Sequence, residues 1–161
     1  MTARVTLRPF KAGDAQALFP IFADAAAMRY WSTPPHASIE VTRAFVRATM
    51  EASQSGQGDD QVIVFDGQVI GKAGLWNNEE VGFILAPAFW GQSLAREALE
   101  AVLARARARG VTRITADVDP RNAASIGLLT RLGFERTGEA KASAKVGDEW
   151  VDSLYFELAL R

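Results

Sequence analysis

The sequence predicts an α+β fold in which helices flank a mixed β-sheet. Two observations lead to this prediction. Segments that alternate polar and apolar residues, as half-buried strands do, occur in both halves of the chain. Between them lie segments whose apolar residues recur at helical spacing. The expected order is strand, helices, three antiparallel strands, helix, strand, helix and two closing strands.

The first elements are a strand and several helices. The strand is expected over Val5 to Pro9. Asp14 is expected to cap the first helix, which Pro20 should kink or end early. A short second helix is expected over Ala25 to Tyr30, and Ser38 is expected to cap a longer third one.

Three strands joined by tight turns should follow. Ser53 to Asp60 is polar and contains glycine, so it is interpreted as a surface loop. The pair Asp66-Gly67 stands between apolar residues and is a strong signal for a two-residue hairpin. Asn77-Asn78 forms the next turn, and the third strand runs over Glu80 to Leu85.

The second half alternates helices and strands. A helix with one apolar stripe is expected over Gln92 to Arg109, followed by a strand over Arg113 to Asp119. Together with the strand before it, this helix should form a right-handed parallel crossover. A further helix is expected over Ala123 to Leu132, and two strands close the chain, Phe134 to Thr137 and Trp150 to Leu160.

Composition excludes several classes of function. The chain has 161 residues, and its 18 Lys and Arg against 19 Asp and Glu give a net charge of −1. Such a chain has no strong field for nucleic acid or an anionic membrane. It has no cysteine and one histidine, which argues against thiol chemistry and a multi-histidine metal site. Without a signal-like or membrane-spanning run, we expect one cytoplasmic domain over residues 1–161.

The turn into the helix that follows Pro87 is the first candidate binding site. Phe89 to Ala98 reads FWGQSLAREA. The first N–H groups of a helix have no internal partner, and the helix dipole adds positive potential there. Gly91, Ser93 and Ala95 are small enough to let a phosphate approach the backbone, and Arg96 adds charge. The alternative is an ordinary turn whose small residues serve packing.

This turn resembles the acetyl-CoA pyrophosphate loop of the GNAT superfamily of N-acetyltransferases. It is most similar to the branch of ribosomal-protein alanine and serine N-terminal acetyltransferases, which usually shows Trp-Gly-Gln-Gly. Here Ser93 stands in place of that second Gly. The other segments that resemble this branch, in the same order, are Leu7–Phe10 with Asp14-Ala15, Tyr30-Trp31 with Pro35-His36, Glu80–Phe83, Asn122–Ser125 with Leu132–Phe134, and Asp152 after Trp150.

The resemblance implies a fold and a co-substrate, acetyl-CoA. The fold is a twisted mixed sheet, split into a V between two central strands, which here should be Glu80–Leu85 and Arg113–Asp119. The pantetheine arm would lie in the V, and the amide of one asparagine would contact it; the alternative for this asparagine is a helix cap. The cofactor-binding residues implied by the resemblance are Phe83, Leu85, Gly91, Gln92, Ser93, Leu94, Ala95, Arg96 and Asn122.

Direct attack of an amine on the thioester requires a base but no covalent enzyme intermediate. An α-amine has a reference pKa of about 8, so losing its proton costs little near neutral pH. Glu80 is the first candidate base, because alternation places it on the face opposite Phe83 and Leu85. Its neighbour Glu79 competes for the role, and His36 is the second candidate. Each could equally be a structural residue.

Further roles rest on the resemblance alone. Ser125 would protonate the departing thiolate, because the usual tyrosine is missing from its helix. The alternative for Ser125 is a helix residue that bonds back to the backbone. Tyr30, Trp31 and His36, with the loop around Lys141 to Asp148, would line the acceptor side.

The acceptor is therefore expected to be a protein or peptide N-terminal α-amine. A small amine, such as a polyamine, an amino acid or an aminoglycoside, is the first alternative. A domain that binds acyl-CoA without turnover is the second, supported by Ser93 and the missing tyrosine. Both a monomer and a homodimer are compatible with the sequence.

Overall fold

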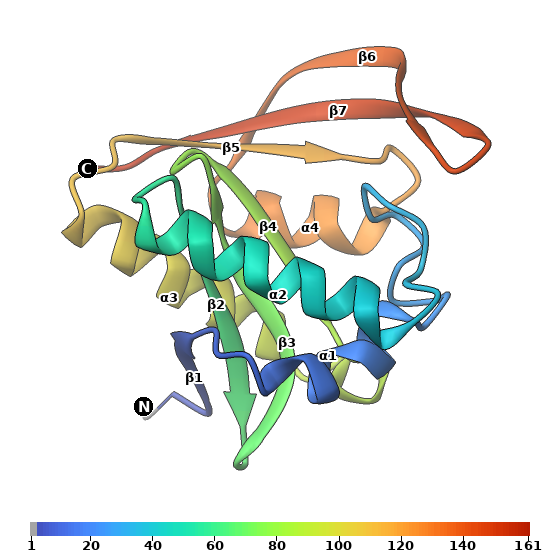
Figure 1. The fold of residues 1–161 in the computed structure, drawn as a ribbon. Coiled ribbons are helices and arrows are strands. Elements are labelled where there is room, and N and C mark those ends of the chain that lie inside the picture. Colours follow the sequence, from blue (N-terminus) through green and yellow to red (C-terminus); the bar gives the residue numbers. More distant parts are fainter. Residues whose placement is uncertain (1–2) are drawn as a thin grey trace.

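The computed structural model describes residues 3–161, and within them seven strands form one mixed sheet (Figure 1). The strand order is β1-β2-β3-β4-β5-β7-β6. The strands are β1 (Val5–Pro9), β2 (Gly58–Phe65), β3 (Gln68–Trp76), β4 (Glu80–Leu85), β5 (Arg113–Val118), β6 (Glu135–Val146) and β7 (Glu149–Ala159). The helices are α1 (Asp14–Phe22), α2 (Ile39–Gln54), α3 (Leu94–Ala108) and α4 (Ala123–Arg131), with a short 3-10 helix at Pro87–Phe89. The predicted α+β class is confirmed.

The sheet separates two hydrophobic cores. On one face, α1 and α2 pack over buried residues that include Val62 and Ile84. On the other face, α3 and α4 pack over a larger core that includes Leu85 and Ala116 (Figure 1). Adjacent residues of β4 thus enter different cores, as strand alternation requires. None of the helices between residues 3 and 161 is long and apolar enough to cross a membrane.

The centre of the sheet is split, as predicted. β4 and β5 are parallel neighbours, yet their register holds a single pair, Glu80 with Thr115. The Thr115 N–H donates to the Glu79 carbonyl across 2.9 Å. Beyond this point no strand of the described chain pairs with β4 on that side, whereas β3 pairs with β4 along its whole length. The two halves of the sheet therefore diverge from one contact point.

The N-terminal helices differ from the prediction in their caps and in the segment after α1. Gly13, not Asp14, occupies the N-cap of α1, because the Asp14 carboxylate already accepts hydrogen bonds from Arg8 and the Lys11 N–H. Pro20 lies inside α1, two residues before its end. Ala25 to Tyr30 forms consecutive turns rather than a helix, since the Asp24 carboxylate caps the chain locally by accepting from the Ala27 N–H. Ser38 stands at the N-cap of α2 but its side chain makes no cap hydrogen bond.

Two strands are longer than predicted. β2 begins at Gly58, inside the segment interpreted as a loop, and pairs there with Trp76. β6 continues to Val146 and pairs with β7, so Lys141 to Asp148 is the end of a hairpin rather than a loop. Both misses have one cause. These segments are polar and rich in small residues, and an edge strand such as β6 needs no apolar face to stay paired.

Candidate active site

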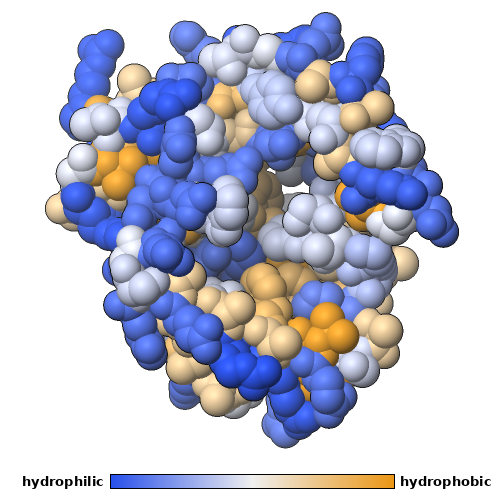
Figure 2. All heavy atoms as spheres, turned by 45° about the horizontal axis from the view of Figure 1, so that its top comes forward, coloured by the Kyte–Doolittle hydropathy of each residue, from blue (hydrophilic) through white to orange (hydrophobic). Residues whose placement is uncertain are grey.

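A cavity of about 1640 Å³ follows the split between β4 and β5. Figure 2 shows it as a hollow near the middle of the visible face. Every predicted site residue except Gln92 lines it. Gln92 instead faces outward, and its carbonyl accepts a hydrogen bond from Arg4 across 2.8 Å. The lining residues predicted from the sequence are Tyr30, Trp31, His36, Glu80, Phe83, Leu85, Gly91, Ser93, Leu94, Ala95, Arg96, Asn122 and Ser125.

The open edge of β4 presents unpaired backbone to this cavity. The Ala86 N–H donates to Ile70 on β3, and antiparallel pairing alternates from there. The N–H and carbonyl groups of Phe83 and Leu85, which lie beyond the one pair with β5, therefore point away from β3 and into the split. The Leu85 carbonyl accepts from the indole N–H of Trp90 across 2.8 Å. The backbone N–H and carbonyl of Phe83, in the middle of β4, therefore remain available to an extended ligand.

The turn before α3 has an unusual backbone. Gly91 has a φ of 76° and Ser93 a φ of 62°, both in the left-handed region. Two such residues bring the first N–H groups of α3 to the cavity, where Leu94, Ala95 and Arg96 form part of the lining. The positive φ also explains why glycine suits position 93, since a residue with a Cβ is strained there by about 1–2 kcal/mol.

Ser93→Gly is expected to raise the free energy of unfolding by up to about 1 kcal/mol, because relief of strain exceeds the added flexibility of the unfolded chain. Urea unfolding measures the change. Ser38→Gly is the matched control, because Ser38 has a φ of −152° and carries no such strain. It should lose a little stability, and equal losses in both variants would contradict the argument.

Asn122 and Ser125 begin α4 at the opposite wall. The Asn122 side-chain oxygen accepts from the Ser125 N–H across 3.2 Å, so the capping alternative is satisfied. The amide NH2 of the same side chain stays available as a donor, and both residues line the cavity. Capping and ligand contact are compatible. On α3, Arg96 forms an ion pair with Glu100 across 3.0 Å, which directs its charge along the helix.

Glu80 differs sharply from Glu79 in its surroundings. Glu79 is exposed and ion-paired with Arg113 across 2.7 Å. Glu80 is half-buried in the cavity wall and has no ion-pair partner among residues 3–161. Burial raises the pKa of Glu80, and the negative charges of Asp117 and then Glu79 raise it further. The Glu80 carboxylate is thus a stronger base than an exposed one.

His36 is held as a packing residue. Its ring stacks on Phe22 at 4.7 Å and Nδ1 lies 2.7 Å from the Thr42 hydroxyl. Burial lowers the pKa of His36, so the imidazole is neutral near pH 7. It lines the cavity, but its ring is already fixed by contacts on the α1–α2 side.

Tyr30 and Trp31 each have cationic side chains close to their rings. The Tyr30 ring has Arg29 at 4.9 Å and Arg121 at 5.6 Å. Trp31 packs edge-on against Phe22 and faces the Lys72 ammonium at 5.1 Å. Both aromatic residues line the cavity.

Sequence reasoning missed three features of the cavity. Lys72 and Asp60 form an ion pair in its floor, and Asp117 faces Glu80 from β5. Arg121 joins Asp119 to Glu149 at 2.7 and 3.0 Å and so ties the β6–β7 hairpin to the start of α4. The one available signal was a lysine within the glycine-flanked run from Gly71 to Gly74. No three metal-binding side chains cluster within the described part of the chain.

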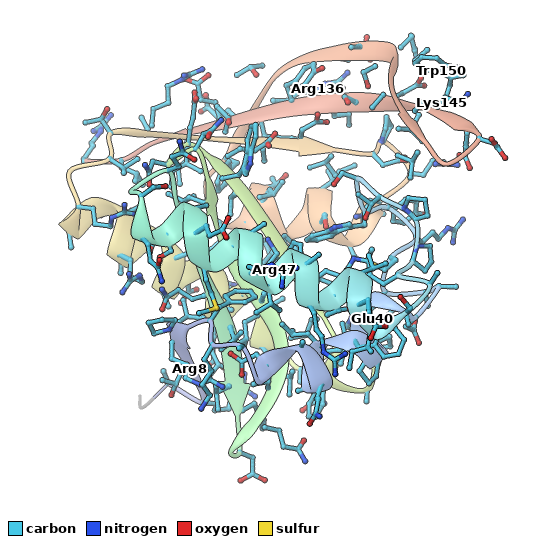
Figure 3. The ribbon with its side chains drawn as sticks, viewed as in Figure 1. Arg8, Glu40, Arg47, Arg136, Lys145 and Trp150 are labelled. Atoms are coloured by element: carbon cyan, nitrogen blue, oxygen red, sulfur yellow. The ribbon has the colours of Figure 1, made fainter. Side chains whose placement is uncertain are left out.

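The β6–β7 hairpin forms one wall of the cavity. Ala144, Val146 and Val151 line the cavity. Figure 3 shows Lys145 and Trp150 near the end of the hairpin, pointing away from α2. Trp150 is 62% exposed and Lys145 is its register partner. The two arms therefore present alternate residues to the cavity and to the outside.

Comparison with known proteins gives a consistent result. The family described as acetyltransferase (GNAT) domain matches residues 4–135. An uncharacterized N-acetyltransferase p20 of Bacillus licheniformis is 27% identical over 99% of this chain and 95% of that protein. An L-methionine sulfoximine/L-methionine sulfone acetyltransferase of Pseudomonas aeruginosa is 39% identical over 70 residues, which are 44% of this chain and 41% of that protein.

Solved structures share the fold. RimL, a ribosomal L7/L12 alpha-N-protein acetyltransferase, superposes with a TM-score of 0.90 at 20% identity, over 99% of this chain and 92% of that one. The microcin C7 self-immunity acetyltransferase MccE, solved with acetyl-CoA and AMP, gives 0.89 at 15% identity over 99% and 94%. Spermidine N-acetyltransferase from Vibrio cholerae, solved with CoA and spermine, gives 0.85 at 18% identity over 98% and 96%.

Proposed function

The chain belongs to the GNAT acetyltransferase family, and we propose that it transfers the acetyl group of acetyl-CoA to the N-terminal α-amine of a protein or peptide. The enzyme class, an N-acetyltransferase, follows from the family and from the named relatives. One observation carries the finer proposal. A single cavity joins the N-terminal turn of α3 to the open edge of β4 and to Glu80.

The residues present fit acetyl-CoA. The first N–H groups of α3 suit a diphosphate, because they are unpaired and lie at the positive end of the helix dipole. The Phe83 backbone suits an amide-containing arm, because its N–H and carbonyl point into the split. When bound, acetyl-CoA supplies a thioester-activated acetyl group. Ser125 and the Asn122 amide line the wall opposite β4, where they can donate hydrogen bonds.

Glu80 is proposed to accept the proton of the acceptor amine. Only the neutral amine has a free lone pair, and an α-amine with a pKa of about 8 needs a modest base. Because the pKa of Glu80 is raised, it lies closer to the pKa of the amine. A smaller difference between the two favours proton transfer, directly or through water. Trp31 and the neighbouring Tyr30 line the same cavity and would flank the amine in this proposal.

A peptide acceptor is supported by the shape of the site and by its structural relatives. The acceptor half of the cavity is walled by the turns around Tyr30 and by the β6–β7 hairpin, and it opens to the outside. Ribosomal-protein acetyltransferases share this fold. The second candidate is a free amino acid derivative, and the 39% identical segment shared with the methionine sulfoximine acetyltransferase favours it.

An acceptor panel tests the proposal. Thiol release from acetyl-CoA is followed with Ala- and Ser-starting peptides, free amino acids, polyamines and aminoglycosides, and mass spectrometry locates the added acetyl group. We expect turnover on the peptide α-amine. Turnover restricted to amino acids would favour the second candidate. Absence of transfer to every amine would overturn the proposal.

Asp117→Asn is expected to shift the acid limb of the kcat/KM profile to lower pH. The negative charge of Asp117 raises the pKa of Glu80, so its removal lets Glu80 ionise at lower pH. The rate at high pH should stay near that of the unmodified enzyme. Asp66→Asn, in the distant β2–β3 turn, is the control and should leave the profile unchanged. A shift to higher pH in Asp117→Asn would contradict the assignment.

A further inference from the structure

The floor of the acceptor half holds a buried ion pair with no role in the reaction above. The Lys72 ammonium lies 3.0 Å from the Asp60 carboxylate, and their side chains are 7% and 17% exposed. Both residues line the cavity. Lys72 also faces the Trp31 ring at 5.1 Å, so an aromatic side chain lies beside the ammonium.

Two glycines lie beside this pair. Asp60, Gly74 and Gly82 are register partners across β2, β3 and β4, and so they lie in one row on one face of the sheet. A Cβ at Gly74 would come within 2.7 Å of the Asp60 carboxylate, and one at Gly82 would lie 3.6 Å from the Lys72 nitrogen. The Lys72 ammonium therefore sits over Gly82, two residues along β4 from Glu80 and on the same face.

The ammonium has hydrogen-bonding capacity to spare. A lysine carries three N–H donors, and in the described chain Lys72 makes one hydrogen bond, to Asp60. A buried N–H group without an acceptor costs free energy, so a hydrogen bond from it to an oxygen of the ligand is favourable. The charge of Lys72 is balanced by Asp60, so a neutral carbonyl oxygen is as suitable a partner as a carboxylate.

We propose that Lys72 binds the oxygen that follows the α-carbon of the acceptor, and that the site thereby selects α-amino carbonyl compounds. This inference rests on the proposed function and names its substrate class. The α-nitrogen and the carbonyl oxygen of one residue are roughly 3 Å apart, and a hydrogen bond of about 2.9 Å at each end extends the span. That span covers the spacing of about 7 Å between alternate residues of a strand, here Glu80 and Gly82.

The same ammonium disfavours polyamines. A polyamine offers no oxygen to Lys72 and brings a second positive charge toward it. Free alanine, alaninamide and an Ala-peptide all share the required oxygen, whereas isopropylamine keeps the carbon skeleton of alaninamide and replaces its carboxamide with a methyl group. Isopropylamine is therefore the comparison ligand, because it keeps the amine and the carbon skeleton but offers no carbonyl oxygen.

Equilibrium binding to the CoA-saturated protein tests the inference without requiring turnover. Calorimetry compares alaninamide, free alanine, an Ala-peptide, isopropylamine and spermidine on the unmodified protein and on the double variant Lys72→Met with Asp60→Asn, which leaves no unpaired buried charge. We expect alaninamide to bind at least about tenfold more tightly than isopropylamine, as one lost hydrogen bond to a charged group implies. The double variant should lose this preference.

The outcomes separate the two proposals. Lys145→Met, on the outward side of the hairpin, is the control and should keep the preference for alaninamide. Equal binding of isopropylamine and alaninamide, undetectable binding of alaninamide, or a preference that survives in the double variant would each overturn the inference. If the double variant does not fold, the ligand comparison on the unmodified protein decides. Tight binding of alaninamide without acetyl transfer would overturn the proposed function alone.

Discussion

Glu80→Gln is expected to lower kcat/KM for acetyl transfer by about 10²–10⁴-fold, the usual contribution of a general base. Glutamine keeps the size and the hydrogen-bonding shape of the side chain but cannot accept a proton. Glu80 is half-buried in the wall of the cavity and has no cation beside it in the described chain. Thiol release with a saturating peptide acceptor, measured from pH 5 to pH 9, gives the effect.

The same variant should not lose stability at neutral pH. The pKa of Glu80 is raised in the folded protein, first by burial and then by Asp117 and Glu79. An acid with a raised pKa favours the folded state fully below its unfolded pKa and loses this contribution as pH rises through the folded pKa. Glutamine removes the buried charge, so Tm at pH 7 should be equal to or above that of the unmodified protein.

Glu79→Gln is the matched control. Glu79 is adjacent in sequence but exposed and ion-paired with Arg113, so its removal should leave kcat/KM at high pH nearly unchanged. Because its charge also raises the pKa of Glu80, the acid limb should move only slightly, to lower pH. An equal loss of activity in both variants would show that the local charge, rather than a positioned base, matters. Full activity of Glu80→Gln across the pH range would remove Glu80 from the proposed mechanism.

The backbone-based part of the site was predictable from the sequence. A glycine-containing turn before an amphipathic helix predicts free N–H groups, and alternation in Glu80–Leu85 assigns each residue a face. The resemblance then indicated which strands diverge, and the single pair between Glu80 and Thr115 confirms the split. These predictions succeeded because they depend on local chain geometry.

Contacts between distant segments were not predictable in this way. The Lys72–Asp60 pair depends on the register of neighbouring strands, which brings residues from β2 and β3 together on one face. The length of β6 was missed because the strand consists of small and charged residues on the edge of the sheet. In each case the decisive information is the partner across the sheet, which no pattern within the segment contains.

Ser93→Asp is expected to weaken CoA binding by about tenfold or more. Ser93 is exposed at the N-cap of α3 and lines the cavity beside the first N–H groups of the helix. Like charges about 4 Å apart repel by roughly 1–4 kcal/mol at effective dielectric constants between those of water and a protein surface. A carboxylate here would therefore oppose the proposed diphosphate. Calorimetry with CoA at low and high salt measures the loss, which salt should reduce.

Ser93→Asn separates charge from shape. Asparagine matches aspartate in size and tolerates the left-handed backbone at position 93, where φ is 62°. It should keep CoA affinity near that of the unmodified protein. Aspartate should also leave Tm unchanged or higher, since an acidic residue at a helix N-terminus is favourable. If the carboxylate stabilises the helix but lowers the affinity for CoA, the helix N-terminus is an anion site. An equal loss of CoA affinity in both variants would show that only space at position 93 matters.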